Sequence, residues 1–261
     1  MSDPRPIGVF DSGIGGLTVV HALRRRLPSE SIIYLGDTAR VPYGTKSHAT
    51  IERYTLQAGA ILQRYDPKLL VIACNTASAH GLPALERASP VPVLGVIEPG
   101  ADEAAKVEGP IGVIGTLATV QSGAYEAAIR HRKPGAEIHA IACPLLVALA
   151  EEGWLDDPLT VEACRRYLAA MPDSVKAIVL GCTHYPVLKP SFEKAHPGTT
   201  WIDSAEATAK AVEALLTERG ARREGGRGDL KVLLTDASSR LQEVGSRFLG
   251  EELGAVEVVD I

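Results

Sequence analysis

The chain has 261 residues, of which 46% are hydrophobic and 23% are charged, and its formal net charge is −5. This composition predicts a globular protein with one large core or two smaller ones. The negative net charge argues against a nucleic-acid partner, because a protein that binds nucleic acid needs a basic face. No apolar run has the length of a signal-peptide core or a membrane span. The four cysteines indicate a reducing compartment rather than a disulfide framework. We therefore expect a cytoplasmic protein without a membrane partner.

In the first hundred residues, short apolar runs rich in β-branched residues alternate with segments of helical periodicity. The runs predict buried strands at 7–10, 32–35, 69–73 and 91–96. The segments between them predict helices at 17–27, 47–65 and from about residue 78 onward. Pro42 and Gly44 interrupt both periodicities, so residues 41–44 are expected to form a loop. We expect the chain to cross to a second unit at Glu98-Pro99-Gly100.

The same alternation continues to the end of the chain. It predicts strands at 111–114, 137–142, 177–181, 200–203, 231–235 and 256–259, and helices at 120–131, 145–152, 161–168 and 205–219. This pattern is typical of an α/β fold with mainly parallel sheets. We expect the last two strands to return to the first unit. Residues 1–97 and 207–261 would then form a discontinuous first domain, and residues 98–206 a second domain.

Two pairs of segments in the chain resemble each other. The sequence IGVFDS at 7–12 resembles IGVIGT at 111–116, and LLVIACNT at 69–76 resembles AIVLGCTH at 177–184. Nearly equal separations within the two pairs indicate a duplicated αβ unit, although short hydrophobic strands can also resemble each other by chance. Parallel sheets bind ligands outside the carboxyl ends of their strands. Two similar domains facing across a cleft would therefore each contribute one thiol to the site.

The two thiols in these repeats belong to Cys74 and Cys182. Each follows a predicted strand and precedes polar residues that suit a helix start, where free N–H groups favour a thiolate. Either cysteine could instead be an ordinary buried residue. Zinc is another alternative, with His184 as a third ligand, but no CxxC or paired-histidine spacing supports a four-ligand site. A thioredoxin-like role would need closely spaced cysteines, and we expect Cys143 and Cys164 to lie in the core.

The glycine-rich turn DSGIGG at 11–16 has three interpretations. A turn of this kind between a strand and a helix can hold a phosphate, and Asp37 after the next strand matches part of a dinucleotide-binding pattern. The pattern is incomplete because Thr18 occupies the third glycine position, and Asp11 would repel an anion. The turn could also be purely structural, or Asp11 and Ser12 could face a ligand.

Two further polar residues are candidates for the same site. His184 could tune the Cys182 thiol, carry a proton itself, or cap the backbone. Glu151 ends a predicted helix and could point toward the cleft, although such a glutamate is more commonly exposed.

Four motifs together resemble those of the glutamate racemase family, within the aspartate/glutamate racemase superfamily. They are FDSGIGG at 10–16, PYG at 42–44, ACNT at 73–76 and GCTHYP at 181–186. The resemblance covers nearly the whole chain in the right order, and the combination is highly specific. It implies interconversion of L- and D-glutamate at Cα in an interdomain cleft, without pyridoxal phosphate, metal or other cofactor, to supply D-glutamate for bacterial peptidoglycan. Aspartate as the substrate is the near alternative.

The resemblance also implies roles for individual residues. Cys74 would deprotonate the D-enantiomer and Cys182 the L-enantiomer, while Asp11, Glu151 and His184 would assist proton transfer. The implied substrate-binding residues are Asp11, Ser12, Pro42, Tyr43, Gly44, Asn75, Thr76, Thr116, Thr183 and His184. Ala148 stands where the family commonly has proline, which weakens the match around Glu151. Because racemases of this type are often dimers, we expect a homodimer.

Overall fold

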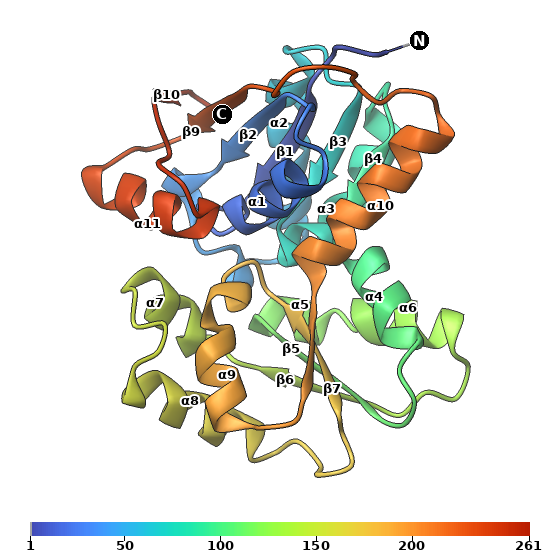
Figure 1. Cartoon of the computed structure of the whole chain (residues 1–261), viewed down its shortest axis with the longest axis vertical. Helices are drawn as coiled ribbons and strands as arrows, with labels where there is room; N and C mark the ends of the chain where they lie inside the picture. Colours follow the sequence, from blue (N-terminus) through green and yellow to red (C-terminus); the bar gives the residue numbers. More distant parts are fainter. Residues whose placement is uncertain (1) are drawn as a thin grey trace.

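The computed structural model describes residues 2–261 and contains two parallel β-sheets, one above the other (Figure 1). The upper sheet consists of β1 (Ile7–Asp11), β2 (Ile32–Gly36), β3 (Leu69–Ile72), β4 (Val93–Gly95), β9 (Leu230–Leu234) and β10 (Val256–Val258). The lower sheet consists of β5 (Ile111–Gly115), β6 (Ile138–Ala142), β7 (Ala177–Gly181) and β8 (Thr200–Asp203). All paired strands within both sheets are parallel, so the α/β prediction is confirmed.

The four strands of the lower sheet follow the same order as four neighbouring strands of the upper sheet. The upper sheet runs β10-β9-β2-β1-β3-β4 and the lower sheet runs β6-β5-β7-β8. The order β2-β1-β3-β4 therefore matches β6-β5-β7-β8, with β9 and β10 added beside β2. Cys74 follows β3 and Cys182 follows β7, which occupy corresponding places. The predicted duplication thus agrees with the topology, and it brings the two cysteines to equivalent strand ends.

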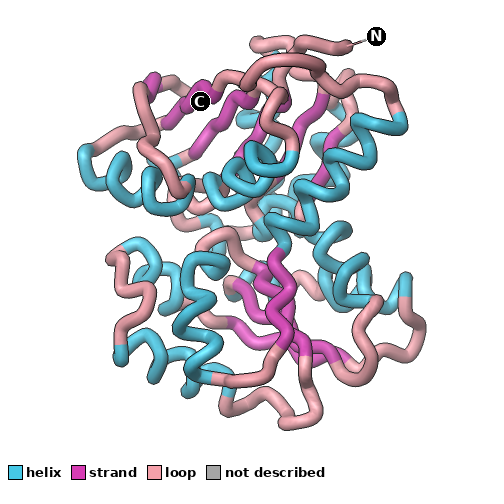
Figure 2. Tube along the Cα trace, viewed as in Figure 1, coloured by secondary structure: helices cyan, strands magenta, loops and turns pink. Residues whose placement is uncertain are grey.

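Helices cover both faces of the upper sheet, as Figure 2 shows. On one face lie α1 (Leu17–Arg26), α10 (Ser204–Glu218) and α11 (Ser239–Leu249), and on the other lie α2 (His48–Gln63) and α3 (Asn75–Ala88). Alternate strand residues divide between these faces: Leu69 and Val71 pack with the first group, and Leu70 and Ile72 with the second. Because both faces are buried, the strands are continuously apolar, which is the signal that predicted them.

The lower sheet is also covered on both faces. One face packs against α4 (Ile97–Ala105) and α6 (Ala124–Arg132). The other packs against α7 (Leu145–Glu151), α8 (Pro158–Leu168), α9 (Lys189–Ala195) and the short η3 (Tyr185–Leu188). We call each sheet with its covering helices a lobe. Between the lobes lie α5 (Leu117–Gln121), η1 (Thr38–Arg40) and η2 (Tyr43–Thr45), and α10 contacts both α1 and α4.

Several predicted boundaries were wrong. The helix after Cys74 begins at Asn75 rather than near residue 78, because the cysteine itself is its N-cap. The expected crossover at Glu98-Pro99-Gly100 lies inside α4, where Pro99 is in the first turn and its missing N–H removes no helical hydrogen bond. The single helix predicted at 120–131 is two helices, α5 and α6, separated at Gly123, whose φ of 63° a helix does not allow. Helix α9 was not predicted.

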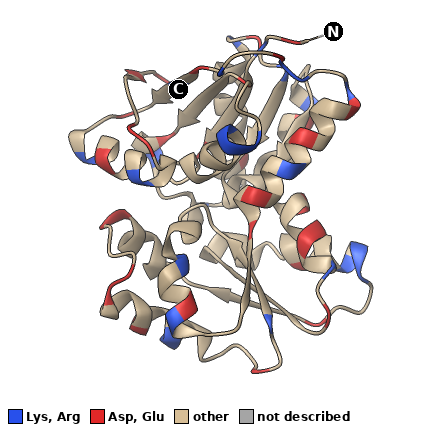
Figure 3. Cartoon of the chain, in the orientation of Figure 1, with Lys and Arg blue, Asp and Glu red and all other residues tan. Residues whose placement is uncertain are grey.

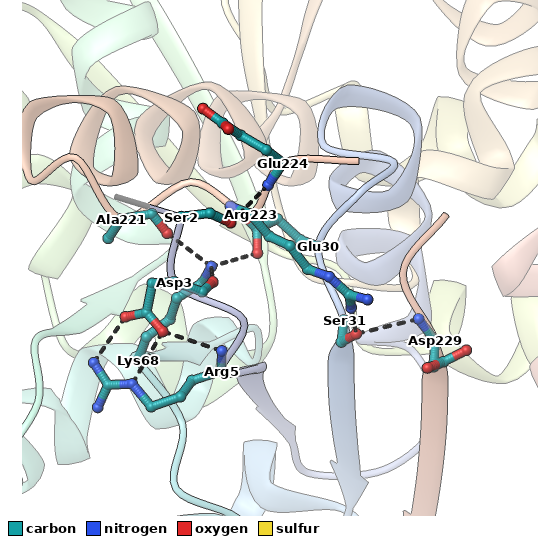
Figure 4. Close-up of polar contacts among 10 residues, drawn as sticks. All are labelled: Ser2, Asp3, Arg5, Glu30, Ser31, Lys68, Ala221, Arg223, Glu224 and Asp229. Carbon is teal, nitrogen blue, oxygen red and sulfur yellow. Dashed lines mark hydrogen bonds and ion pairs between the residues drawn. The ribbon is translucent and has the colours of Figure 1, made fainter. Parts of the chain in front are cut away.

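Charged residues of both signs are interspersed on the helices of both lobes (Figure 3). One ion pair differs from the others because it is buried: Lys68 Nζ lies 2.6 Å from Glu30 Oε2, and both side chains are 1% exposed. Lys68 also donates to the carbonyl oxygens of Asp3 and Ala221, and Glu30 accepts from the Arg223 N–H (Figure 4). This cluster therefore joins the N-terminal segment, the start of β3 and the loop after α10. Among the described helices, none combines the length and apolar character that a bilayer crossing requires.

Candidate active site

A cavity of about 410 Å³ lies between the lobes, where the strands of both sheets end. Its wall is formed by the segments that follow β1, β3, β5 and β7, together with η2 and α7. All of the predicted site residues except Asp11 line it. The strand topology explains this convergence, since parallel strands deliver their C-terminal residues to one edge of each sheet, and these edges face each other.

The thiol of the upper lobe is held by the first turn of α3. Cys74 is the N-cap of this helix, its Sγ accepts a hydrogen bond from the Ala77 N–H at 3.4 Å, and its thiol donates to Ser12 Oγ at 3.4 Å. Burial and, next, the charge of Asp11 raise the pKa of the Cys74 thiol to about 12, although the contacts with Ser12 and Ala77 act in the opposite direction. Cys74 is therefore a thiol at neutral pH, which is the form that gives a proton.

Asp11 lies beside this thiol but not on the cavity wall. It ends β1, is fully buried, and accepts a hydrogen bond from the Gly13 N–H at 2.9 Å through Oδ2, while Oδ1 has no partner among residues 2–261. Burial raises the pKa of the Asp11 carboxyl, partly offset by the charge of His184. In this geometry Asp11 affects the pKa of Cys74 from behind the cavity wall, and the substrate contact expected from the sequence stays a prediction.

The thiol of the lower lobe has a different set of partners. Cys182 Sγ lies 3.9 Å from Nδ1 of His184, and His184 Nε2 lies 2.9 Å from Oε1 of Glu151 at the end of α7. Burial by itself would lower the pKa of His184, but the hydrogen bonds to Cys182 and Glu151 raise it to about 10. The bond from His184 in turn lowers the pKa of Glu151. The imidazole of His184 therefore lies between the Glu151 carboxylate and the Cys182 thiol.

The glycine-rich turn brings these two halves together. A Cβ on Gly15 would lie 2.5 Å from side-chain atoms of Thr183 and His184, and a Cβ on Gly16 would lie 2.4 Å from Asp11 Cβ. The hydroxyl of Thr18, in the adjoining helix α1, donates to the Thr183 carbonyl at 3.0 Å. Gly15 is therefore required where the turn touches the segment after β7, and Gly16 where the turn passes Asp11. These contacts supply a reason for the glycines that does not involve a phosphate.

Polar groups from both lobes surround the thiols. The Asn75 side-chain oxygen accepts from the buried Tyr125 hydroxyl at 2.7 Å, and its buried Nδ2 has no hydrogen-bond partner in the part of the chain that the structure describes. The hydroxyls of Thr76 and Thr116 lie 2.9 Å apart and join the lobes. Tyr43 lines the cavity, but its hydroxyl donates to the buried Asp37 at 2.5 Å, so this hydroxyl is already used.

Some cavity residues were not predicted. They are mostly apolar: Gly13, Val41, Thr45, Leu117, Pro144, Val147 and Ala148. One signal could have identified the last three, because positions 144, 147, 148 and 151 share one face of a helix and Glu151 was already a candidate. The others adjoin predicted site residues in the chain.

The alternative roles proposed for the cysteines find little support in the structure. Across residues 2–261, no group of three or more histidine, cysteine or acidic side chains is arranged to hold a metal ion. All four cysteines are free thiols. Cys143 and Cys164 are fully buried in the core and do not line the cavity, as predicted.

Comparisons with known proteins agree with this geometry. Residues 17–212 match the family described as Asp/Glu/Hydantoin racemase. The glutamate racemase of Chlorobaculum tepidum is 47% identical over 265 residues, covering 99% of this chain and 97% of the relative. The crystal structure of glutamate racemase from Thermus thermophilus in complex with β-chloro-D-alanine has a TM-score of 0.92 at 45% identity, over 99% of this chain and 98% of that one. For the Francisella tularensis glutamate racemase in complex with D-glutamate, the TM-score is 0.94 at 38% identity, with the same coverage. The chain belongs to the Asp/Glu/hydantoin racemase family.

Proposed function

We propose that this protein interconverts L- and D-glutamate without a cofactor, with Cys74 and Cys182 as the two bases that act on opposite faces of Cα. The observation that carries this proposal is the delivery of one thiol from each of two equivalent strand ends to a single cavity. Glutamate as the substrate is supported by full-length relatives named glutamate racemase, one of them solved with D-glutamate.

The chemistry explains why two thiols are useful. Inversion requires that the Cα hydrogen leaves one face as a proton and that another proton arrives on the opposite face. A thiolate accepts the first proton and a thiol gives the second, so the pair exchanges roles when the reaction reverses. The Cα–H is a very weak acid, so positioning and electrostatic stabilisation must lower most of the barrier.

The surroundings of the two thiols support one starting protonation state. Cys74, with its pKa raised to about 12, begins as the thiol. We assign the starting thiolate to Cys182, whose Sγ lies 3.9 Å from Nδ1 of His184. This state suits proton removal by Cys182 and delivery by Cys74, which is the direction from L- to D-glutamate if Cys182 acts on the L-enantiomer. For the reverse direction the proton must first move to the lower lobe, with Asp11, His184 and Glu151 assisting.

Substrate carboxylates fit the polar groups of the cavity wall. The first N–H groups of α3, at Asn75 and Thr76, lie beside Cys74 and are suited to an anion. We assign the same function to Ser12 and Thr183 on the facing segments. Pro42, Gly44 and Thr116 would complete the binding site, with Tyr43 contributing its backbone rather than its hydroxyl.

A circular-dichroism time course with pure L-glutamate and pure D-glutamate, in chelator-containing buffer without cofactor, tests this function. We expect both signals to decay to zero. If L-aspartate is racemised and glutamate is not, the substrate assignment is wrong and the chemistry stands. If a folded sample racemises neither, the racemase assignment fails.

This proposal also covers the domain boundaries, the oligomeric state, the location and the cellular role of the protein. We take residues 1–97 and 207–261 as the first domain and residues 98–206 as the second, with Met1 outside the described residues. This division is supported by β9 and β10, which extend the upper sheet. We also propose a homodimer, testable by analytical ultracentrifugation, on the basis of the family resemblance. A cytoplasmic location is proposed because the thiol chemistry needs reduced cysteines. A role in D-glutamate supply for peptidoglycan is proposed from the family resemblance.

A further inference from the structure

Helix α11 of the upper lobe reaches across to the polar pair behind Cys182. Its Phe248 is 3% exposed and meets the ring of His184 edge-on, with ring centroids 5.1 Å apart and an interplanar angle of 77°. Such an edge-to-face pair favours one orientation of both rings beyond simple burial. Phe248 therefore restricts rotation of the imidazole whose two nitrogens face Cys182 and Glu151.

The neighbouring residue of α11 fixes the other end of the same pair. Arg247 donates from Nη1 to the backbone carbonyl of Glu151 at 3.2 Å, at the point where α7 ends. The last carbonyl groups of a helix have no partner within it and carry a partial negative charge, so a guanidinium stabilises them. Arg247 thus holds the residue that bears the carboxylate partner of His184.

The backbone after α7 is shaped to admit this arginine. Gly153 has a φ of 79°, which favours glycine, and a Cβ at this position would lie 2.8 Å from the guanidinium carbon of Arg247. A second arginine of the helix, Arg240, pairs with Glu152. Three consecutive positions after the main body of α7 therefore contact α11.

We propose that Phe248 and Arg247 are positioning residues that hold His184 and Glu151 in the geometry which keeps Cys182 reactive. The proposal rests on the proposed function for its catalytic meaning, but the contacts themselves do not depend on the substrate. Neither residue lines the cavity. Both act through others and contact only the lower half of the site, because the contacts of Cys74 are with Ser12 and Ala77.

The asymmetry between the thiols supplies an internal control. The ionisable groups around His184 are Cys182, Glu151 on α7 and Asp11 on β1, with the Arg240 charge acting on Glu151. Loosening the imidazole weakens its contact with Cys182 Sγ and so lowers the reactivity of that cysteine. Cys74 in the same molecule should not respond.

The test is the rate of alkylation by iodoacetamide at each thiol, followed between pH 6 and pH 9 by mass spectrometry of the peptides that contain Cys74 and Cys182. We expect Phe248→Leu to slow Cys182 labelling threefold to tenfold at pH 7.5 and to shift its pH profile upward, with Cys74 unchanged. Arg247 is partly exposed, so Arg247→Met tests the same idea with little risk to folding, and Arg247→Lys should restore part of the rate. Val244→Ala, a buried change on α11, is the matched control.

Two results would overturn the proposal. One is wild-type labelling of Cys182 in both Phe248→Leu and Arg247→Met. The other is an equal change at both cysteines, or the same change in Val244→Ala, which would mean that α11 only supports the fold. Because labelling needs no substrate, it decides this proposal even if the wild-type protein fails to racemise glutamate, so the two failures are distinguishable. With active enzyme, the variants should lower kcat and leave KM nearly unchanged.

Discussion

Disruption of the buried Lys68–Glu30 pair should be strongly destabilising, and removing its cation tests this directly. In Lys68→Met the carboxylate of Glu30 stays buried and keeps one hydrogen bond, from the Arg223 N–H at 2.8 Å. The carbonyl groups of Asp3 and Ala221 also lose a donor at 2.8 Å each. Breaking a buried pair in this way typically costs about 3–5 kcal/mol, because an uncompensated charge remains. We expect a loss of unfolding free energy in this range.

Urea denaturation measures the loss. With a slope of about 2–3 kcal/mol per molar, the transition midpoint should fall by roughly 1–2 M. The double variant Glu30→Met/Lys68→Met should recover most of the loss, since apolar residues often replace a buried pair without penalty. Arg5→Met is the control: its pairs with Asp3 and Asp66 are at the surface and should contribute about 1 kcal/mol or less.

The result that refutes this reasoning is a Lys68→Met protein within 1 kcal/mol of wild type, or a double variant no more stable than the single one. Catalysis offers a second check. Lys68 precedes β3, whereas Cys74 follows its opposite end, so the racemisation rate of the folded variant should match that of wild type.

Three other predictions concern the site itself. Alanine in place of either Cys74 or Cys182 should reduce racemisation by at least 10²–10⁴-fold, the usual contribution of a proton-transfer partner; unchanged interconversion in either variant would end the two-base account. Because the folded-state pKa of His184 is raised from 6.5 to about 10, its interactions contribute stability that is complete below pH 6.5 and lost as the pH rises toward 10. The stability advantage of wild type over Glu151→Gln should follow this window in urea titrations at several pH values, and a pH-independent difference would contradict it. Tyr125→Phe removes the hydroxyl that donates to the side-chain amide at the start of α3, so KM should rise more than kcat falls; an unchanged KM would mean that this amide does not bind substrate.

Local sequence signals were sufficient to predict the α/β architecture and to single out both thiols as candidates. Fully buried parallel strands are continuously apolar, so β3 and β7 could be recognised together with the cysteine that follows each. The duplication then predicted that these cysteines would share a cleft. Glu98-Pro99-Gly100, the expected crossover, lies in α4, because a proline in a first helical turn is compatible with the helix.

Contacts between distant segments could not be predicted in this way. Phe248 and Arg247 lie in an ordinary amphipathic helix, and nothing in their local pattern indicates a contact with His184 or Glu151. The burial of Asp11 behind the cavity wall likewise depends on the way the glycine-rich turn packs against Thr183, which is a tertiary contact. The sequence identified Asp11 as a candidate but not its position, and it did not identify Phe248 or Arg247.

In the proposed mechanism two monoprotic thiols act on opposite faces of Cα. The reaction of unlabelled L-glutamate in D₂O, analysed at low conversion, tests this mechanism most directly. We expect each molecule of D-glutamate formed to carry deuterium at Cα, while the remaining L-glutamate keeps its protium. D-glutamate that retains the original hydrogen, or L-glutamate that exchanges before any product forms, would contradict it.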